Sequence, residues 1–290
     1  MTETASASTE RSSAEPVIAF LGSGSMNGAI LRGVLASGAP AERVRATTRS
    51  QGSRDRLSQE TGVEVLATEA DEEANRRAVE GADIVLLGVK PYAILELCDD
   101  IRPALDPSTV VVSVAAGVSL AAMAAHLPEG QPIVRCMPNT PSSVGAGALS
   151  VTPSESVSEQ QTREVSDILG AVGIVVQVPE ELIGAVTGVS GSGPAYAFLL
   201  AEMMQKAGER LGLDAETART LAKQTVYGAG RLLEPQDADP EALRKAVTSP
   251  NGTTERAVGT FLDGGIEELV ARSVKASADR GEEMEQEYTG

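Results

Sequence analysis

The sequence has few of the residues from which several common kinds of site are built. Of its 290 residues, one is histidine, two are cysteine and none is tryptophan. Zinc hydrolysis and Ser-His-Asp catalysis both depend on histidine, so both lose their usual residues. The cysteines, Cys98 and Cys136, lack the spacing of a metal or redox pair. They suit a reducing compartment, and we expect no metal site.

Aromatic residues and positive charge are also scarce. Aromatics make up 2% of the chain, and the formal net charge is −17. Such a surface repels phosphate backbones and offers few rings for stacking, so no nucleic-acid partner is expected. No apolar run reaches the roughly eighteen residues of a membrane span, and residues 1–15 resemble neither a signal nor a transit peptide. We expect a cytoplasmic protein with no membrane partner and a disordered tail over residues 1–15.

The apolar pattern divides the rest of the chain in two. Short Val/Ile/Leu-rich runs alternate with helical patterns in the first part, which predicts a parallel sheet with helices on both faces. Strands are expected at residues 16–21, 44–47, 82–89, 109–114 and 133–136, with 147–152 and 174–178 near an edge. From Pro194 onward the periodicity is helical almost throughout. We predict a sheet domain over residues 16–178 and a helical domain over residues 179–290.

A glycine-rich turn follows the first expected strand and opens the first helix. In a dinucleotide fingerprint, Gly22 would permit the tight turn, and Gly24 would let a pyrophosphate approach the helix N-terminus together with Ser25 and Met26. The third glycine of the fingerprint is replaced by Asn27, so the match is imperfect. An ordinary glycine-rich loop is the alternative.

The end of the second expected strand bears on the choice of cofactor. An acid at this point usually binds the ribose 2′-hydroxyl of NAD. This sequence instead has Thr48, Arg49 and Ser50, with no carboxylate among them. Arg49 can pair with a 2′-phosphate, which favours NADP over NAD. A solvated basic loop is the alternative.

Five further segments make a specific resemblance. They read GVKP (88–91), AAGVS (115–119), RCMPNTP (135–141), GSGPAY (191–196) and TSPNGTT (248–254). In this order they resemble the pyrroline-5-carboxylate reductases over nearly the whole chain, from Val17 to about Arg280. The last two segments are more specific than the glycine turn.

The resemblance implies a fold, a reaction and an assembly. The fold would be a Rossmann-type doubly wound sheet followed by an all-α dimerisation domain. NADPH would reduce 1-pyrroline-5-carboxylate, a cyclic imino acid, to L-proline. A homodimer would form through the helical domain, with larger rings such as a decamer. Further cofactor-binding residues would lie at strand ends: Val89, Lys90, Pro91, Ala115, Ala116, Gly117, Pro138 and Asn139. The alternatives are a surface role for Lys90, close packing for the small residues and a plain turn at Asn139.

The segment near residue 250 is the expected substrate site. A helix starting near Gly252 would leave free N–H groups for a carboxylate. Its residues are Ser249, Pro250, Asn251, Gly252, Thr253 and Thr254. Asn251 stands where many relatives have glycine, and asparagine tolerates positive φ. By resemblance, Thr254 is the catalytic candidate, because it matches the family's threonine near the ring nitrogen. A plain helix-turn-helix joint is the alternative.

Other functions remain open at this point. The chain could be a related NADP-dependent imine reductase or a hydroxyacid dehydrogenase with a helical second domain. The latter usually needs a catalytic lysine, and no lysine lies between Lys90 and Lys206. A non-catalytic NADP-binding protein is the third possibility, but the presence of the substrate segment counts against it.

Overall fold

The computed structural model describes residues 15–235 and 237–289. Its contacts divide the chain into two compact units. The first runs to Glu180 and takes in the chain again from Glu283, and the second is Glu181–Glu282. Apart from Glu15, the expected tail lies outside the described residues. The boundary expected after residue 178 stays a prediction.

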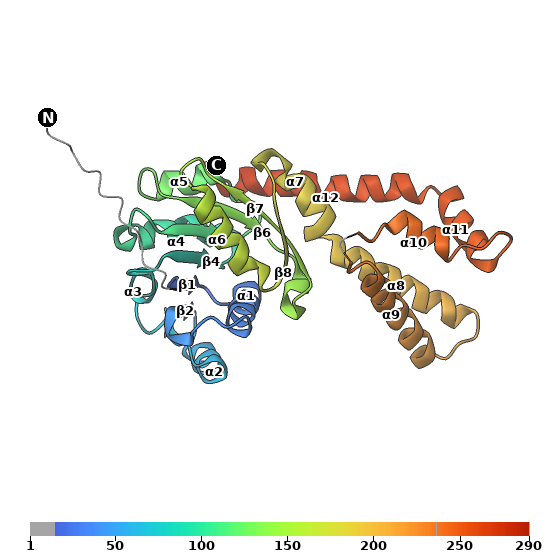
Figure 1. The fold of residues 1–290 in the computed structure, drawn as a ribbon, viewed down its shortest axis with the longest axis horizontal. Helices are drawn as coiled ribbons and strands as arrows, with labels where there is room; N and C mark the ends of the chain where they lie inside the picture. Colours follow the sequence, from blue (N-terminus) through green and yellow to red (C-terminus); the bar gives the residue numbers. More distant parts are fainter. Residues whose placement is uncertain (1–14, 236, 290) are drawn as a thin grey trace, which may run out of the picture. The chain divides into compact units, whose positions relative to one another are not determined.

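The first unit is built on an eight-stranded sheet in the order β3-β2-β1-β4-β5-β6-β7-β8 (Figure 1). The strands are β1 (Ile18–Leu21), β2 (Val44–Thr48), β3 (Glu64–Ala67), β4 (Ile84–Leu87), β5 (Val110–Ser113), β6 (Ile133–Met137), β7 (Gly147–Pro153) and β8 (Gly173–Gln177). All neighbours are parallel except β6 and β7. The predicted Rossmann-type sheet is confirmed. Its last two strands, β7 and β8, run opposite to the other six, and the apolar pattern did not predict the edge strand β3.

Helices cover both faces of this sheet, which explains why its strands are apolar on both sides. They are α1 (Ser25–Ala36), α2 (Gln51–Thr61), α3 (Ala74–Val79), α4 (Ile94–Ile101), α5 (Leu120–His126) and α6 (Glu159–Gly170). Along β1, Ile18 and Phe20 pack with α1, α2 and α6, while Ala19 and Leu21 pack with α3, α4 and α5. Parallel strands buried in this way bring their carboxyl ends to one edge of the sheet.

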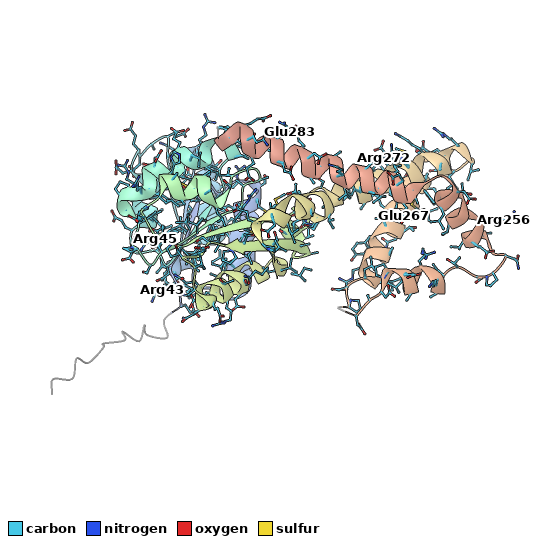
Figure 2. The ribbon with its side chains drawn as sticks, turned by 90° about the horizontal axis from the view of Figure 1, so that it is seen from above. Arg43, Arg45, Arg256, Glu267, Arg272 and Glu283 are labelled. Atoms are coloured by element: carbon cyan, nitrogen blue, oxygen red, sulfur yellow. The ribbon has the colours of Figure 1, made fainter. Side chains whose placement is uncertain are left out.

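The second unit is helical, as the sequence predicts. Its helices are α7 (Ile183–Val186), α8 (Gly193–Arg210), α9 (Ala215–Leu232), α10 (Pro240–Ala246), α11 (Thr253–Asp263) and α12 (Ile266–Thr289), the last of which ends in the first unit. Asp214 caps α9 and Asp239 caps α10 through their carboxylates. Charged side chains, including Glu267, Arg272 and Glu283, project along α12 (Figure 2).

Much apolar surface of the second unit remains uncovered. Phe198 is 68% exposed and Leu211 is 89% exposed. Within the helical stretch Glu180–Arg210, an 18-residue window has a mean hydropathy of 1.2. Among the described residues this stretch alone is long and apolar enough to cross a membrane, by length and composition only. Polar residues interrupt this stretch, so it contains no unbroken apolar run of that length. An exposed apolar surface of this kind also marks a protein–protein interface.

Candidate functional site

The glycine turn after β1 has the geometry of a dinucleotide cradle. Gly22 has a φ of +71°, and a Cβ there would lie 2.6 Å from Cγ1 of Val89. Gly24 is the N-cap of α1, and a Cβ there would meet only the Gly22 carbonyl oxygen, at 4.0 Å. The start of α1 therefore offers backbone donors to a pyrophosphate that can approach without meeting a side chain. These residues fit the pyrophosphate of a dinucleotide.

The contacts of the Asn27 side chain explain why asparagine can replace the third glycine of the fingerprint. Its side chain is fully buried, and its Nδ2 donates to the carbonyl oxygens of Leu21 at 3.0 Å and Leu86 at 3.1 Å. A Cβ on Gly88, the residue after β4, would lie 2.2 Å from the Asn27 Cγ. The Asn27 amide therefore fits only because residue 88 is a glycine. The third fingerprint glycine normally permits close helix–strand packing. Here Gly88 supplies that clearance from the other side.

The segment after β2 carries the expected cation. Arg49 is exposed and forms no ion pair or side-chain hydrogen bond with a described residue. Ser50 caps α2 by accepting from the Ser53 N–H at 3.3 Å. No carboxylate neighbours Arg49 in the sequence, but the structure brings one to this segment: the Gln51 N–H donates to Oε1 of Glu69 at 2.7 Å. Glu69 follows β3, the strand that the sequence pattern did not predict, so its position was missed.

The remaining strand-end residues gather at the same edge of the sheet. Val89, Lys90 and Pro91 follow β4, and Ala115, Ala116 and Gly117 follow β5. Because β1, β4, β5 and β6 are parallel neighbours, these segments lie beside the glycine turn. Lys90 is exposed and has no ion pair with a described residue.

The segment after β6 has a structural role. Pro138 and Asn139 are buried, and Oδ1 of Asn139 accepts from the Ala148 N–H on β7 at 2.9 Å. This hydrogen bond holds the turn between β6 and β7. It favours the turn interpretation of Asn139, although its place at the sheet edge still lets the segment line a cofactor site.

A buried arginine on β6 ties several parts of the first unit together. The Arg135 side chain is 5% exposed and pairs with Glu180 at 3.0 Å and Glu285 at 2.9 Å. Oε1 of Glu180 also accepts from the Leu120 N–H at the start of α5, at 2.8 Å. Glu180 and Glu285 lie on the two chain passages between the units. Both partners lie far from Arg135 in the sequence, so no local pattern predicts this network.

The last turns of α12 reach the loop after β5. Gly117 has a φ of +73°, and a Cβ there would lie 3.1 Å from Cβ of Met284 and 3.4 Å from Cδ2 of Tyr288. Together with the Arg135–Glu285 pair, this contact explains why the chain from Glu283 onward belongs to the first unit.

The expected substrate segment forms the start of α11 in the second unit. Asn251 adopts a φ of +59°, as its tolerance of this region allows, and Gly252 is the N-cap without a side-chain capping bond. The Asn251 N–H donates to Oε2 of Glu255 at 2.7 Å, which fixes the turn. The N–H groups of Thr253 and Thr254 find no acceptor among the described residues. They are free to bind an anion.

The histidine and the two cysteines are either hydrogen-bonded near the surface or buried. His126 pairs with Asp99 at 2.9 Å at the exposed end of α5. Burial raises the pKa of the Cys98 and Cys136 thiols to about 12. In the described part of the chain, no three His, Cys, Asp or Glu residues cluster as metal ligands do.

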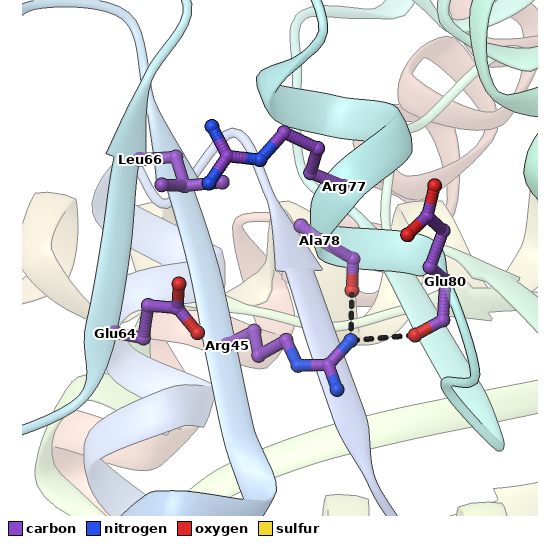
Figure 3. Close-up of a pocket in the computed structure, with 6 residues that line it drawn as sticks. All are labelled: Arg45, Glu64, Leu66, Arg77, Ala78 and Glu80. Atoms are coloured by element: carbon purple, nitrogen blue, oxygen red, sulfur yellow. Dashed lines mark hydrogen bonds between the residues drawn. The ribbon is translucent and has the colours of Figure 1, made fainter.

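A pocket lies at the opposite, amino edge of the sheet. Its volume is about 250 Å³, and β2, β3 and α3 provide its walls (Figure 3). It is lined by Arg45, Glu64, Leu66, Arg77, Ala78 and Glu80. Nη1 of Arg45 already donates to the Glu80 carbonyl oxygen at 2.6 Å. None of the sequence motifs reaches this pocket, so it is not the candidate site.

The fold, together with the residues at the carboxyl edge of the sheet, defines the class of protein: a two-unit oxidoreductase with a Rossmann-type nucleotide-binding sheet. A family model described as "NADP oxidoreductase coenzyme F420-dependent" matches residues 17–117. A second, described as "Pyrroline-5-carboxylate reductase dimerisation", matches residues 180–284. A pyrroline-5-carboxylate reductase of Pseudomonas aeruginosa is 42% identical over 93% of this chain and 97% of its own length. The chain belongs to the pyrroline-5-carboxylate reductase family.

Solved structures agree with this assignment. A pyrroline-5-carboxylate reductase from Coxiella burnetii matches with a TM-score of 0.87 and 38% identity, over 93% of this chain and 98% of that one. The enzyme of Plasmodium falciparum, described with NADP bound, shares the fold at a TM-score of 0.78 and 24% identity, over 93% and 98% of the two chains. The match to the dimerisation model also explains why apolar side chains on the helices of the second unit are exposed in a single chain.

Proposed function

We propose that this chain reduces 1-pyrroline-5-carboxylate to L-proline with NADPH as the hydride donor. The observation that carries the proposal is the start of α11, where Thr253 and Thr254 present unpaired N–H groups beside hydroxyl side chains. A related imine reductase would not need a carboxylate site there, and a non-catalytic NADP-binding protein would need no substrate segment at all. Neither alternative is favoured.

The first unit's residues would bind and orient the cofactor. Gly22, Gly24, Ser25 and Met26 would receive the pyrophosphate at the start of α1. Thr48, Arg49 and Ser50 would receive the 2′-phosphate, with Arg49 as the charged partner. The strand-end residues would line the ribose and nicotinamide: Val89, Lys90, Pro91, Ala115, Ala116, Gly117, Pro138 and Asn139. When bound, NADPH supplies a hydride from its nicotinamide ring.

The substrate segment would hold the imino acid by its carboxylate. The free N–H groups at the start of α11 would bind the two oxygens, helped by hydroxyl groups of Ser249 and Thr253. Pro250, Asn251 and Gly252 would shape the turn, with Asn251 fixed by its bond to Glu255. This binding would fix the position of the ring and of its C=N carbon on the second unit.

Thr254 would act at the ring nitrogen. A protonated imine accepts hydride at carbon and nitrogen keeps its proton, which gives the neutral ring amine; a second proton, taken from water, converts the amine to its ammonium form. The Thr254 hydroxyl can hydrogen-bond the nitrogen and pass a proton from water to it. No histidine or lysine is required for this step, which suits a chain with one histidine paired at the surface.

Assembly completes the proposal. The helical region would form a homodimer, and dimers would join into larger rings such as a decamer, in the cytoplasm. The exposed apolar side chains of α8, including Phe198, support the dimer.

The function is tested with the purified full-length protein, NADPH and the cyclic imino acid. We expect loss of reduced-nicotinamide absorbance and stoichiometric formation of L-proline. Tight NADPH binding without turnover would refute the proposal and favour a non-catalytic protein.

The role of Thr254 is tested by Thr254→Ala and Thr254→Ser. Loss of the hydroxyl should lower kcat/KM by about tenfold or more, and serine should restore most of it. Thr260→Ala is the matched control, because this threonine lies on the same helix and, among the described residues, its hydroxyl donates only to the Arg256 carbonyl oxygen, at 2.9 Å. An unchanged kcat/KM in Thr254→Ala would remove this residue from the mechanism.

A further inference from the structure

We propose that Glu69 sets the balance between NADPH and NADH, by placing a carboxylate on a backbone donor of the segment that would receive the 2′-phosphate. The inference rests on the proposed function, because it assumes that the carboxyl edge of the sheet binds a nicotinamide cofactor. Glu69 would be a specificity-determining residue. The sequence alone suggested a segment without acids.

Two hydrogen bonds hold Glu69 against this segment. The Glu69 N–H donates to the Arg49 carbonyl oxygen at 3.1 Å, which extends the β2–β3 pairing beyond both strands. The Gln51 N–H donates to Oε1 of Glu69 at 2.7 Å. The first bond fixes the backbone of Glu69 and the second its side chain, so the carboxylate is held beside Ser50 and the start of α2.

The carboxylate also uses a donor that an anion would need. The first three N–H groups of α2 belong to Gln51, Gly52 and Ser53. Glu69 occupies the first and the Ser50 hydroxyl the third. Only Gly52 is left without an acceptor among the described residues. The start of α2 is therefore a poorer phosphate site than a free helix N-terminus would be.

Charge adds to this effect. A 2′-phosphate carries between one and two negative charges, and it would bind close to the Glu69 carboxylate. Arg49, exposed and without an ion pair among the described residues, supplies the compensating attraction. NADH has a hydroxyl in place of the phosphate and escapes the repulsion. The cation and the acid therefore act in opposite directions on the choice of cofactor.

The test replaces Glu69 with glutamine, which keeps an oxygen acceptor for the Gln51 N–H and removes the charge. Affinities for NADPH and NADH are measured by calorimetry on the full-length protein without substrate. The matched control is Glu64→Gln, which removes the same charge from the start of the same strand, in the pocket of Figure 3. From Glu64 to Ala67, β3 alone spans about 10 Å, which already exceeds the screening length of about 8 Å at physiological salt. Glu69 lies in the turn that follows.

We expect Glu69→Gln to raise the preference for NADPH over NADH by roughly five- to tenfold, mainly through tighter NADPH binding. The gain should shrink at high salt, because the repulsion is screened. Glu64→Gln should leave the ratio unchanged. An unchanged ratio in Glu69→Gln, or an equal change in both variants, would overturn the inference.

The result also separates this inference from the proposed function. If the unaltered protein binds neither cofactor, both fail together. If it binds both cofactors and reduces the imino acid, but Glu69→Gln does not shift the ratio, only the role of Glu69 fails. Glu69→Ala provides a second variant in which the Gln51 N–H is freed as well, and it should shift the ratio at least as far.

Discussion

Replacing Arg135 with methionine should destabilise the first unit more than any surface substitution. The change keeps most of the side-chain volume but removes a guanidinium that is 5% exposed and pairs with two glutamates, at 3.0 Å and 2.9 Å. Breaking a buried ion pair from one side costs about 3–5 kcal/mol, since the remaining charge stays buried. Both glutamate side chains are 34% exposed, so water can screen part of their charge.

We therefore expect a loss at the lower end of that range, about 3 kcal/mol. In a unit of this size, that loss corresponds to a fall in Tm of roughly 6–12 °C. Calorimetry is the suitable assay, because it separates the transitions of two units that need not unfold together. It also avoids reliance on tryptophan fluorescence, which this chain lacks.

Two further variants make the experiment decisive. Arg163→Met removes an exposed arginine whose pairing distance to Glu159 is 3.6 Å, so it should change Tm very little. Adding Glu285→Gln to Arg135→Met should recover part of the loss, because one uncompensated carboxylate becomes neutral. If Arg135→Met lowers Tm no more than Arg163→Met does, the buried network contributes nothing and the reasoning is wrong.

Two more predictions concern the glycine turn and the thiols. Gly22→Ala should abolish binding of both cofactors, measured by calorimetry, because its Cβ would lie 2.6 Å from Val89 and φ is +71°; binding within twofold of the unaltered protein would contradict this. Cys136, with its pKa raised by burial from 9.0 to about 12, should resist alkylation at pH 8.5 until urea is added. Because the unfolded thiol ionises first, its contribution to stability is complete below about pH 9 and is lost between pH 9 and 12. A titration of Tm that shows no decline there would refute it.

The central strands were predictable because they are buried on both faces. β1 and β4 are apolar throughout, and β5 is apolar up to Ser113, as is typical of strands in a parallel sheet covered on both faces. β3 is an edge strand of four residues that begins with an exposed glutamate. Its apolar pattern was therefore too short to predict a strand. The reversal of β7 depends on how the chain returns after Asn139, and no periodicity encodes that direction.

The same contrast holds at the site. The turn at Gly22, the cap at Gly252 and the positive φ of Asn251 are local properties that residue type predicts. The positions of Glu69 and Glu285 depend on strand pairing and on where α12 ends. Contacts of this kind join segments far apart in the sequence, and local patterns in a single sequence do not predict them.

The end of α12 has a consequence for dissecting the protein. Since the chain from Glu283 returns to the first unit, the helical unit is an insertion within the nucleotide-binding unit rather than an appendix to it. A fragment stopped at residue 178 would keep Arg135 but lose both of its acidic partners, Glu180 and Glu285. An independently folding nucleotide-binding fragment would have to carry the last turns of α12 through a designed linker, as a circularly permuted protein does.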